Sequence, residues 1–132
     1  MTGSSSRERI RTIVAEDSAA VRRAICLFLE QRNGIEVVGT AGDGREALDQ
    51  VKILRPDLVL TDWLMPRMDG LELAAQLRKL DPTIRIIFLS VYDSPDVRIA
   101  SRACGVDGVV ATERLYQELS GELLRIFPQL DR

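Results

Sequence analysis

The sequence of 132 residues contains no histidine and only two cysteines, Cys26 and Cys104. The absence of histidine excludes a histidine-based catalytic triad and a metal site built on imidazole. The two cysteines are far apart in the sequence and lie in apolar helical contexts. This arrangement indicates reduced thiols in the core of a cytoplasmic protein rather than a disulfide framework.

The chain also lacks a large excess of charge and any long apolar run. Its formal net charge of −2 gives no electrostatic basis for direct binding of nucleic acid or of an anionic membrane. No apolar run approaches the roughly 20 residues that are needed to cross a bilayer. The start, MTGSSSRER, is not followed by an apolar region, so we expect no signal peptide or anchor there, and we predict that residues 1–9 form a flexible tail.

The sequence does contain short apolar runs that alternate with segments of helical period. Hydrophobic residues make up 45% of the chain, which is typical of one globular domain of this length. The run Ile35–Thr40 alternates between apolar and polar residues and predicts an edge strand, whereas most of the others are almost continuously apolar, as in buried parallel strands. The five runs are Thr12–Ala15, Ile35–Thr40, Leu58–Thr61, Ile84–Leu89 and Gly108–Ala111.

Strict alternation of strands and helices predicts a parallel sheet with right-handed crossovers, and therefore a three-layer α/β domain. Several residues mark helix boundaries. Asp43 and Asp69 each precede a glutamate at the spacing of a capping box, Ser94 precedes a proline, and Gly105 suits a helix C terminus. In such sheets, ligands bind beyond the carboxyl ends of the strands.

Acidic and hydroxyl residues follow three of the predicted strands. Glu16 and Asp17 end the first strand, Asp62 ends the third, and Ser90 ends the fourth. Because parallel strands bring these positions to one edge, the three carboxylates would repel one another unless a cation joined them. A hard divalent cation, most plausibly Mg²⁺, prefers such oxygen ligands, and it would prepare a carboxylate to receive phosphate.

These features resemble the receiver domain of bacterial two-component response regulators. The resemblance rests on the string D-x-x-M-P-x-M-D-G at Asp62–Gly70, on the acidic pair and on the hydroxyl residue of the fourth strand, and it covers about Ile10 to Phe127. It implies a flavodoxin-like (βα)5 fold with strand order 2-1-3-4-5. It also implies a receiver domain over residues 10–127 and a C-terminal tail over residues 128–132.

The resemblance assigns a role to each residue of the constellation. Asp62 would be the phosphoacceptor for a histidine kinase or a phosphotransfer protein, and the hydroxyl of Ser90 would contact the phosphoryl group. Asp17 and Asp62 would bind Mg²⁺ directly, Glu16 would act through water, and Leu64 would contribute its backbone carbonyl. We expect this chemistry to be autocatalytic and the chain not to be a turnover enzyme.

Each of these residues also has a purely structural interpretation. Asp17 and Ser18 could cap the first helix, and Ser90 could simply end a strand. Asp69, with the glycine that follows it, fits a turn and a cap, which we favour even within the family. Asp62 could be satisfied by nearby backbone amides.

The sequence departs from the family where the fifth strand ends. Receivers usually carry a lysine there and an aromatic residue before it, whereas this chain has Thr112 and Val109. The pocket therefore stays anionic even with a divalent cation. Arg67 or Arg114 could substitute for the lysine, although solvated surface positions are the favoured interpretation of both. Thr112 also has a structural role open to it, since its hydroxyl could cap the last helix.

Val109 bears on switching, and a third departure, Leu64, bears on the lifetime of the phosphoryl group. Val109 lacks the inward and outward positions of the usual aromatic residue, so the coupling from Ser90 to the last helix is in question. Leu64 stands where many receivers have a polar residue near the path of the hydrolytic water. We therefore hypothesise that Leu64 slows loss of the phosphoryl group.

The favoured function is thus an atypical receiver of the cytoplasm, in which phosphorylation shifts a surface formed by the fourth helix, the fifth strand and the fifth helix. Alternatively, the first and last helices could form the interface of a homodimer. The alternative function is a degenerate receiver that acts as a phosphorylation-independent dimerisation or docking module. The pattern at Ser90–Asp93 favours receivers that precede a DNA-binding domain in transcription regulation. A phosphatase or a flavin protein fits less well.

Overall fold

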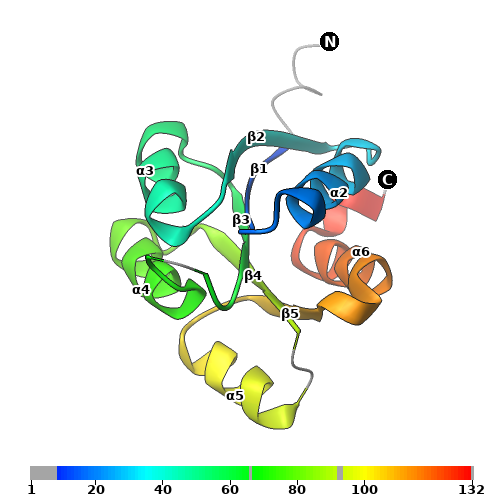
Figure 1. Ribbon diagram of the computed structural model, residues 1–132. Coiled ribbons are helices and arrows are strands. Elements are labelled where there is room, and N and C mark those ends of the chain that lie inside the picture. Colours follow the sequence, from blue (N-terminus) through cyan, green and yellow to red (C-terminus); the bar gives the residue numbers. More distant parts are fainter. Residues whose placement is uncertain (1–8, 66, 92–93, 132) are drawn as a thin grey trace.

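The computed structural model describes residues 9–65, 67–91 and 94–131, and a parallel sheet of five strands forms its centre (Figure 1). The order is β2-β1-β3-β4-β5, so the predicted flavodoxin-like fold and strand order are confirmed. The strands are β1 (Ile10–Ala15), β2 (Ile35–Ala41), β3 (Leu58–Asp62), β4 (Arg85–Ser90) and β5 (Gly108–Ala111).

The burial of each strand follows from its sequence. In β3, β4 and β5 the apolar residues are buried almost without interruption, because helices cover both faces of the sheet. In β2, Glu36 and Thr40 are exposed, and β2 lies at one edge of the sheet. The alternating pattern therefore identified an edge strand correctly.

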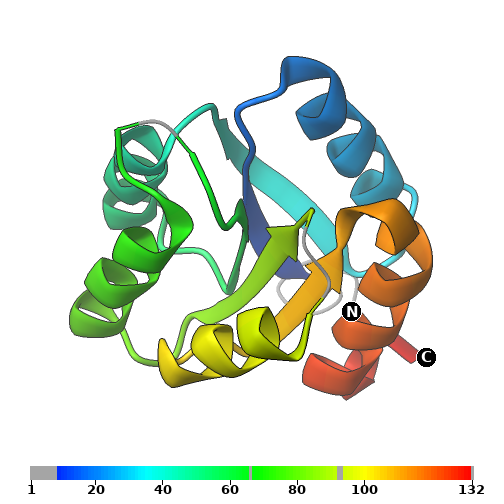
Figure 2. The same ribbon diagram turned by 60° about the horizontal axis from the view of Figure 1, so that its bottom comes forward.

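Helices cover the two faces of the sheet and leave its carboxyl edge accessible (Figures 1 and 2). Residues of α2 and α6 share one core cluster with β1, β3, β4 and β5. Residues of α3 and α4 form the other cluster, and α5 lies next to β5. The helices are α2 (Ala19–Glu30), α3 (Gly44–Leu54), α4 (Gly70–Leu80), α5 (Pro95–Ala103) and α6 (Leu115–Ile126).

Side-chain caps fix the start of the first four helices. Ser18 accepts a hydrogen bond from the third residue beyond it, and Asp43, Asp69 and Ser94 do the same at distances of 2.8 to 3.2 Å. At the end of α5, Gly105 has a φ of 82°, a conformation that glycine adopts without strain. These caps and this stop agree with the spacing in the sequence.

The last helix begins differently from the prediction. Thr112 does not cap α6, because residues Thr112–Arg114 form a short 3₁₀ helix before it, and neither this turn nor α6 has a side-chain cap. The hydroxyl of Thr112 instead donates to the carbonyl oxygen of Ser90 at 3.3 Å. This hydrogen bond therefore ties the connection from β5 to α6 to the end of β4.

The two ends of the domain differ, because among the described residues only the C-terminal end has a further helical turn beyond the outermost helix and strand. Residues 1–8, which belong to the predicted N-terminal tail, lie outside the described residues, as does Arg132. Residues Pro128–Asp131 form a second 3₁₀ helix, and Leu130 packs against the core cluster of α2 and α6. In the part of the chain that is described, no helix combines the length and the apolar character that a bilayer span requires.

Candidate functional site

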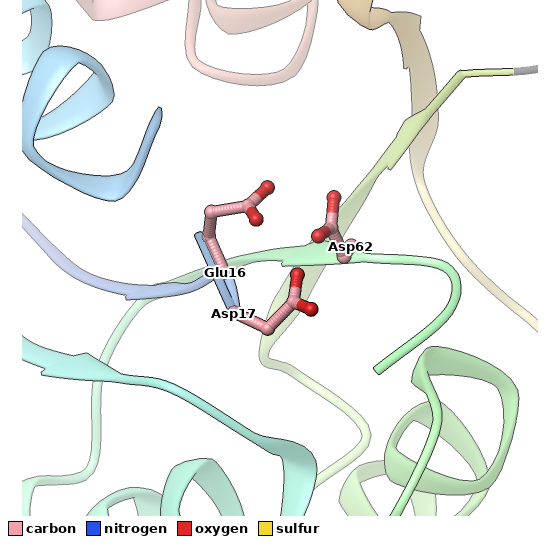
Figure 3. A group of neighbouring side chains, drawn as sticks. All are labelled: Glu16, Asp17 and Asp62. Carbon is pink, nitrogen blue, oxygen red and sulfur yellow. The ribbon is translucent and has the colours of Figure 1, made fainter. Parts of the chain in front are cut away.

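Three carboxylates meet at the carboxyl edge of the sheet (Figure 3). Glu16 and Asp17 follow β1 directly, and Asp62 is the last residue of neighbouring β3. One carboxylate oxygen from each residue lies within 4.8 Å of the others, and the side chains point into a common space. The structure therefore brings together the three acidic residues that the sequence placed at these strand ends.

Glu16 is held rigidly by its own surroundings. Its side chain is only 4% exposed, and one carboxylate oxygen accepts a hydrogen bond of 2.8 Å from the backbone N–H of Ser18. Its backbone N–H donates to Ala41 on β2, and its carbonyl oxygen accepts a bond of 2.7 Å from the guanidinium of Arg22. Arg22 was not identified from the sequence, because no residue pattern signals a hydrogen bond to a backbone carbonyl oxygen six residues earlier.

Asp62 lies in an environment that disfavours its charge. Partial burial, hydrogen bonding with Glu16 and the negative charges of Glu16 and Asp17 raise the pKa of Asp62 to about 9. Without a cation, the protonated, neutral form of Asp62 is therefore favoured at neutral pH. Three carboxylates at this spacing form a donor set that suits a hard divalent cation, which would favour the charged form of Asp62.

Ser90 and Thr112 lie on the other side of the cluster. Ser90 is buried at the end of β4, which pairs with β3, and Thr112 follows β5 and donates its hydroxyl to the Ser90 carbonyl oxygen. Ser90, Thr112 and Asp62 line one cleft of about 720 Å³, together with Glu16, Asp17 and Leu64. All five residues named for the site by sequence thus border the same cavity.

The turn that follows Asp62 depends on glycine. A Cβ at Gly70 would collide with the carbonyl oxygen of Asp62 and would lie 2.9 Å from that of Trp63, and the N–H of Gly70 donates to Trp63 at 2.7 Å. Asp69 caps the following helix, as favoured from the sequence. Pro66, which belongs to the predicted turn, lies outside the described residues.

Neither arginine that the sequence offered as a substitute cation lines the cleft. Arg67 forms an ion pair of 2.9 Å with Asp43, the cap of α3. Arg114 forms ion pairs with Glu113 and, at 2.8 Å, with Glu118. These contacts agree with the favoured interpretation that both arginines lie at the surface.

Glu118 is a second residue that the sequence did not identify. Its carboxylate accepts a hydrogen bond of 3.0 Å from the backbone N–H of Ala111 and also pairs with Arg98 and Arg114. Partial burial opposes its charge, but the hydrogen bonds from Ala111 and Arg114 and the positive charges lower the pKa of Glu118 overall. The helical spacing from Arg114 to Glu118 was visible, whereas the contacts with β5 and α5 required the fold.

The family model of the response regulator receiver domain matches residues 12–119. The chain belongs to this family. The solved signal receiver domain of a response regulator NarL from Mycobacterium tuberculosis has a TM-score of 0.83 to this chain at 29% identity, with 90% of this chain and 96% of that chain covered. The likeness therefore extends over nearly the whole of both receiver domains.

Curated relatives contain receiver domains within longer proteins. A protein-glutamate methylesterase/protein-glutamine glutaminase from Alkalilimnicola ehrlichii is 33% identical over 92% of this chain and 31% of that protein. "Probable transcriptional regulatory protein NarL" of Mycobacterium tuberculosis is 30% identical over 85% of this chain and 52% of that protein. This chain thus spans about a quarter to a half of the length of the curated relatives that it matches.

One expectation from the sequence is wrong as it was stated. We expected no enzyme, but several relatives of this receiver domain are named as enzymes, the protein-glutamate methylesterases/protein-glutamine glutaminases. The match to them covers only 24 to 35% of their length. The expectation that the chain is not an enzyme is therefore overturned as a general statement, because relatives that match it in this region are named as enzymes.

Proposed function

We propose that this chain is the phosphoacceptor domain of a two-component response regulator, with Asp62 as the acceptor. The observation that supports this most directly is the meeting of Asp62 with Glu16 and Asp17 at the carboxyl edge of the sheet. The donor would be a sensor histidine kinase or a phosphotransfer protein. The receiver domain would comprise residues 10–127 and act in the cytoplasm.

The acidic cluster would hold Mg²⁺. Asp17 and Asp62 would bind the ion directly, Glu16 would bind through water, and Leu64 would contribute its backbone carbonyl. The donor set supports this assignment, since it consists of carboxylates whose oxygens approach within 4.8 Å. When bound, the ion would neutralise part of the negative charge and screen the phosphoryl oxygens.

The residues of the chain supply the nucleophile and a hydrogen-bond donor. A carboxylate oxygen of Asp62 would attack phosphorus as the bond from phosphorus to the donor's leaving atom breaks, and the electron pair would depart with the leaving group. Asp62 must be deprotonated for this step, and its raised pKa means that cation binding and reactivity are linked. Ser90 would donate its hydroxyl to a phosphoryl oxygen.

Phosphorylation would shift the population of conformations at a surface that a partner reads. The candidate surface consists of α5, β5 and α6, which Glu118 joins through Arg98, Ala111 and Arg114. A homodimer through α2 and α6 is the other use that we propose for the helical faces. Transcription regulation is one output that relatives suggest, since the NarL relative is named as a transcriptional regulatory protein.

A degenerate receiver is the second candidate function. Thr112 and Val109 favour it, because the lysine and the aromatic residue that are usual in the family are both replaced. Such a domain would bind a metal and dock a partner without a phosphorylation switch.

The experiment that separates the two functions is treatment with acetyl phosphate or beryllofluoride in the presence of Mg²⁺. Intact mass would show an adduct of one phosphoryl group in the natural sequence and none in Asp62→Asn. Amide NMR shifts that spread to α6 would support the switch, whereas metal binding with no adduct would support the static module. An adduct that persists in Asp62→Asn would rule out Asp62 as the acceptor.

A further inference from the structure

The acidic cluster forms only one end of the cleft. The other end lies between the first two turns of α2 and the first turn of α6. Its walls are apolar, with Ala20, Val21 and Ala24 on one side and Leu115 and Tyr116 on the other. The cleft has a volume of about 720 Å³, far more than a metal ion and a phosphoryl group would fill. An apolar compartment therefore continues directly from the acidic floor.

No basic side chain lines this cleft among the described residues. With a divalent cation bound and all three carboxylates ionised, the cluster would carry a net charge of −1 before a phosphoryl group adds more. Arg67 is paired with Asp43, Arg114 is paired with Glu113 and Glu118, and Arg22 donates to a backbone carbonyl. A phosphorylated site would thus retain uncompensated negative charge that the lining of the cleft does not offset.

The mouth of the cleft is bordered by apolar side chains that face solvent. Leu64 is 60% exposed, Val91 is 72% exposed and Tyr116 is 47% exposed, and all three line the cleft. Val21 on α2 is also exposed at 37%. Several exposed apolar side chains that line one pocket are typical of a surface that another protein covers.

We propose that a partner protein supplies the missing cation by inserting a lysine or arginine side chain into this cleft. The charged group would lie near Asp62 and Thr112, and its aliphatic stem would lie against Val21, Leu115 and Tyr116. Apolar residues beside it on the partner would cover Leu64 and Val91. The negative floor and the apolar wall together match a side chain with a long stem and a positive end. This inference rests on the proposed function, since it completes the same site.

The exposed rim favours a protein over a free organic amine. A small amine would occupy the inside of the cleft and leave Leu64 and Val91 in water, whereas a polypeptide segment would bury them. Burial of these side chains contributes about 25 cal/mol for each Å² of apolar area removed from water. The partner segment that fits is therefore a basic residue flanked by apolar residues.

The test uses the whole chain loaded with Mg²⁺ and two matched peptides, N-acetyl-Leu-Lys-Leu-amide and the same peptide with norleucine in place of lysine. Norleucine keeps most of the stem and removes the charge. Amide NMR titration should show tighter binding of the lysine peptide by about fivefold, the upper range for a partly exposed ion pair. The largest shifts should lie at Val21, Leu115 and Tyr116, and beryllofluoride should increase the preference for lysine.

The variant Thr112→Lys provides the matched control, because it places a cation in the same chain. The preference for the lysine peptide should disappear in this variant. Equal binding of the two peptides by the natural chain would overturn the inference, as would equal effects of n-butylammonium chloride and the lysine peptide at the same concentration. These results are independent of phosphorylation: an Asp62 adduct without a preference for lysine would overturn only the inference, and loss of the adduct would overturn the proposed function.

Discussion

At the scale of single residues, the character of the site depends on its three carboxylates and on Thr112, which stands where receivers usually carry a lysine. Asp62 lies beside Glu16 and Asp17, as the strand ends predicted. Thr112, however, neither caps α6 nor adds charge, and it donates instead to the carbonyl oxygen of Ser90. The replacement of a lysine therefore leaves the cleft open and negative, while a hydrogen bond ties the ends of β4 and β5 together.

Leu64 offers a direct test of the lifetime of the phosphoryl group. Its side chain borders the cleft and is exposed, so it can stand in the path of an attacking water without contributing much to the core. We predict that Leu64→Asn hydrolyses its aspartyl phosphate several-fold faster, because an amide can hydrogen-bond to water and orient it. Intact mass after removal of acetyl phosphate would give the half-life.

A matched control for this measurement is Ile53→Asn, which changes an exposed apolar residue on α3, away from the cleft. It should leave the half-life unchanged. A half-life that is the same in Leu64→Asn and the natural chain would show that Leu64 does not shield the phosphoryl group.

At the scale of elements, the connection from β3 to α4 positions the acceptor. Gly70 lies so close to the carbonyl oxygens of Asp62 and Trp63 that a methyl group cannot fit without moving them. We predict that Gly70→Ala destabilises the fold by about 1 to 3 kcal/mol, as overpacking typically does. It should also weaken phosphorylation and metal binding, which depend on the position of Asp62. Urea denaturation and Mg²⁺ titration would measure these two effects.

Gly121 is the control for Gly70, because an alanine at Gly121 has room for its Cβ. It lies within α6, and no atom outside its own helix backbone comes within 4 Å of its added Cβ. Gly121→Ala should therefore stabilise the fold by about 0.4 to 1 kcal/mol, because it restricts the unfolded chain and favours the helix. Similar effects of the two substitutions would contradict the close approach at Gly70.

Glu118 connects three elements and should make their stability depend on pH. The pKa of its carboxyl group is lowered in the folded state, so its contribution is present above the ordinary pKa and is lost as the pH falls through the lowered value. We predict that Glu118→Gln lowers the free energy of unfolding by about 0.5 to 1 kcal/mol at pH 7, as expected for partly exposed ion pairs. The difference should vanish in acid, below the lowered pKa.

Chemical denaturation at a series of pH values would measure this effect. Glu36→Gln, which changes an exposed glutamate on edge strand β2, is the control and should show no comparable change. If Glu118→Gln kept its full effect below the lowered pKa, the ionised carboxylate would not be the source of the stabilisation.

At the scale of the whole molecule, the two core clusters share one sheet, so events at its edge affect global stability. The repulsion at Asp62, Glu16 and Asp17 opposes folding when no cation is bound. We predict that Asp62→Asn raises the free energy of unfolding by about 1 to 3 kcal/mol in the absence of Mg²⁺. Thermal denaturation in a chelating buffer would measure it.

The same variant should respond less to added Mg²⁺. A ligand that binds only the folded state stabilises it by about 2.7 kcal/mol at 100 times its dissociation constant. The natural chain should therefore gain stability with Mg²⁺, whereas Asp62→Asn should gain less because one ligand has lost its charge. Asp49→Asn, at an exposed position of α3, should behave as the natural chain does. An unchanged response in Asp62→Asn would remove Asp62 from the metal site.

The sequence predicted the strands and the helix starts because its apolar runs and its capping residues agree with one another. The run Leu58–Thr61 differs from its observed strand by one residue at one end, and Ile84–Leu89 differs by one residue at each end. The side-chain caps at Asp43, Asp69 and Ser94 appear as predicted. The alternation of strands and helices, with the resemblance to receivers, gave the strand order. These features depend on neighbours in the sequence or on a repeated pattern, and such signals can be read without coordinates.

The sequence could not reveal contacts made by long side chains across elements. The pairing of Arg67 with Asp43, the bonds of Glu118 with Ala111 and Arg98, and the hydrogen bond of Thr112 join residues that lie apart in the chain. Long side chains can reach several partners, and only the packing of the helices selects one of them.

The sequence by itself therefore determined the parallel sheet and the presence of Glu16, Asp17 and Asp62 at its carboxyl edge, because apolar period and strand direction fix which residues end each strand. Only the tertiary structure decided what surrounds them. The continuity of an acidic floor with an apolar cleft, lined by no basic residue among those described, follows from how α2 and α6 pack over the sheet. Distances across such a cleft depend on the packing of whole helices, which no local pattern encodes.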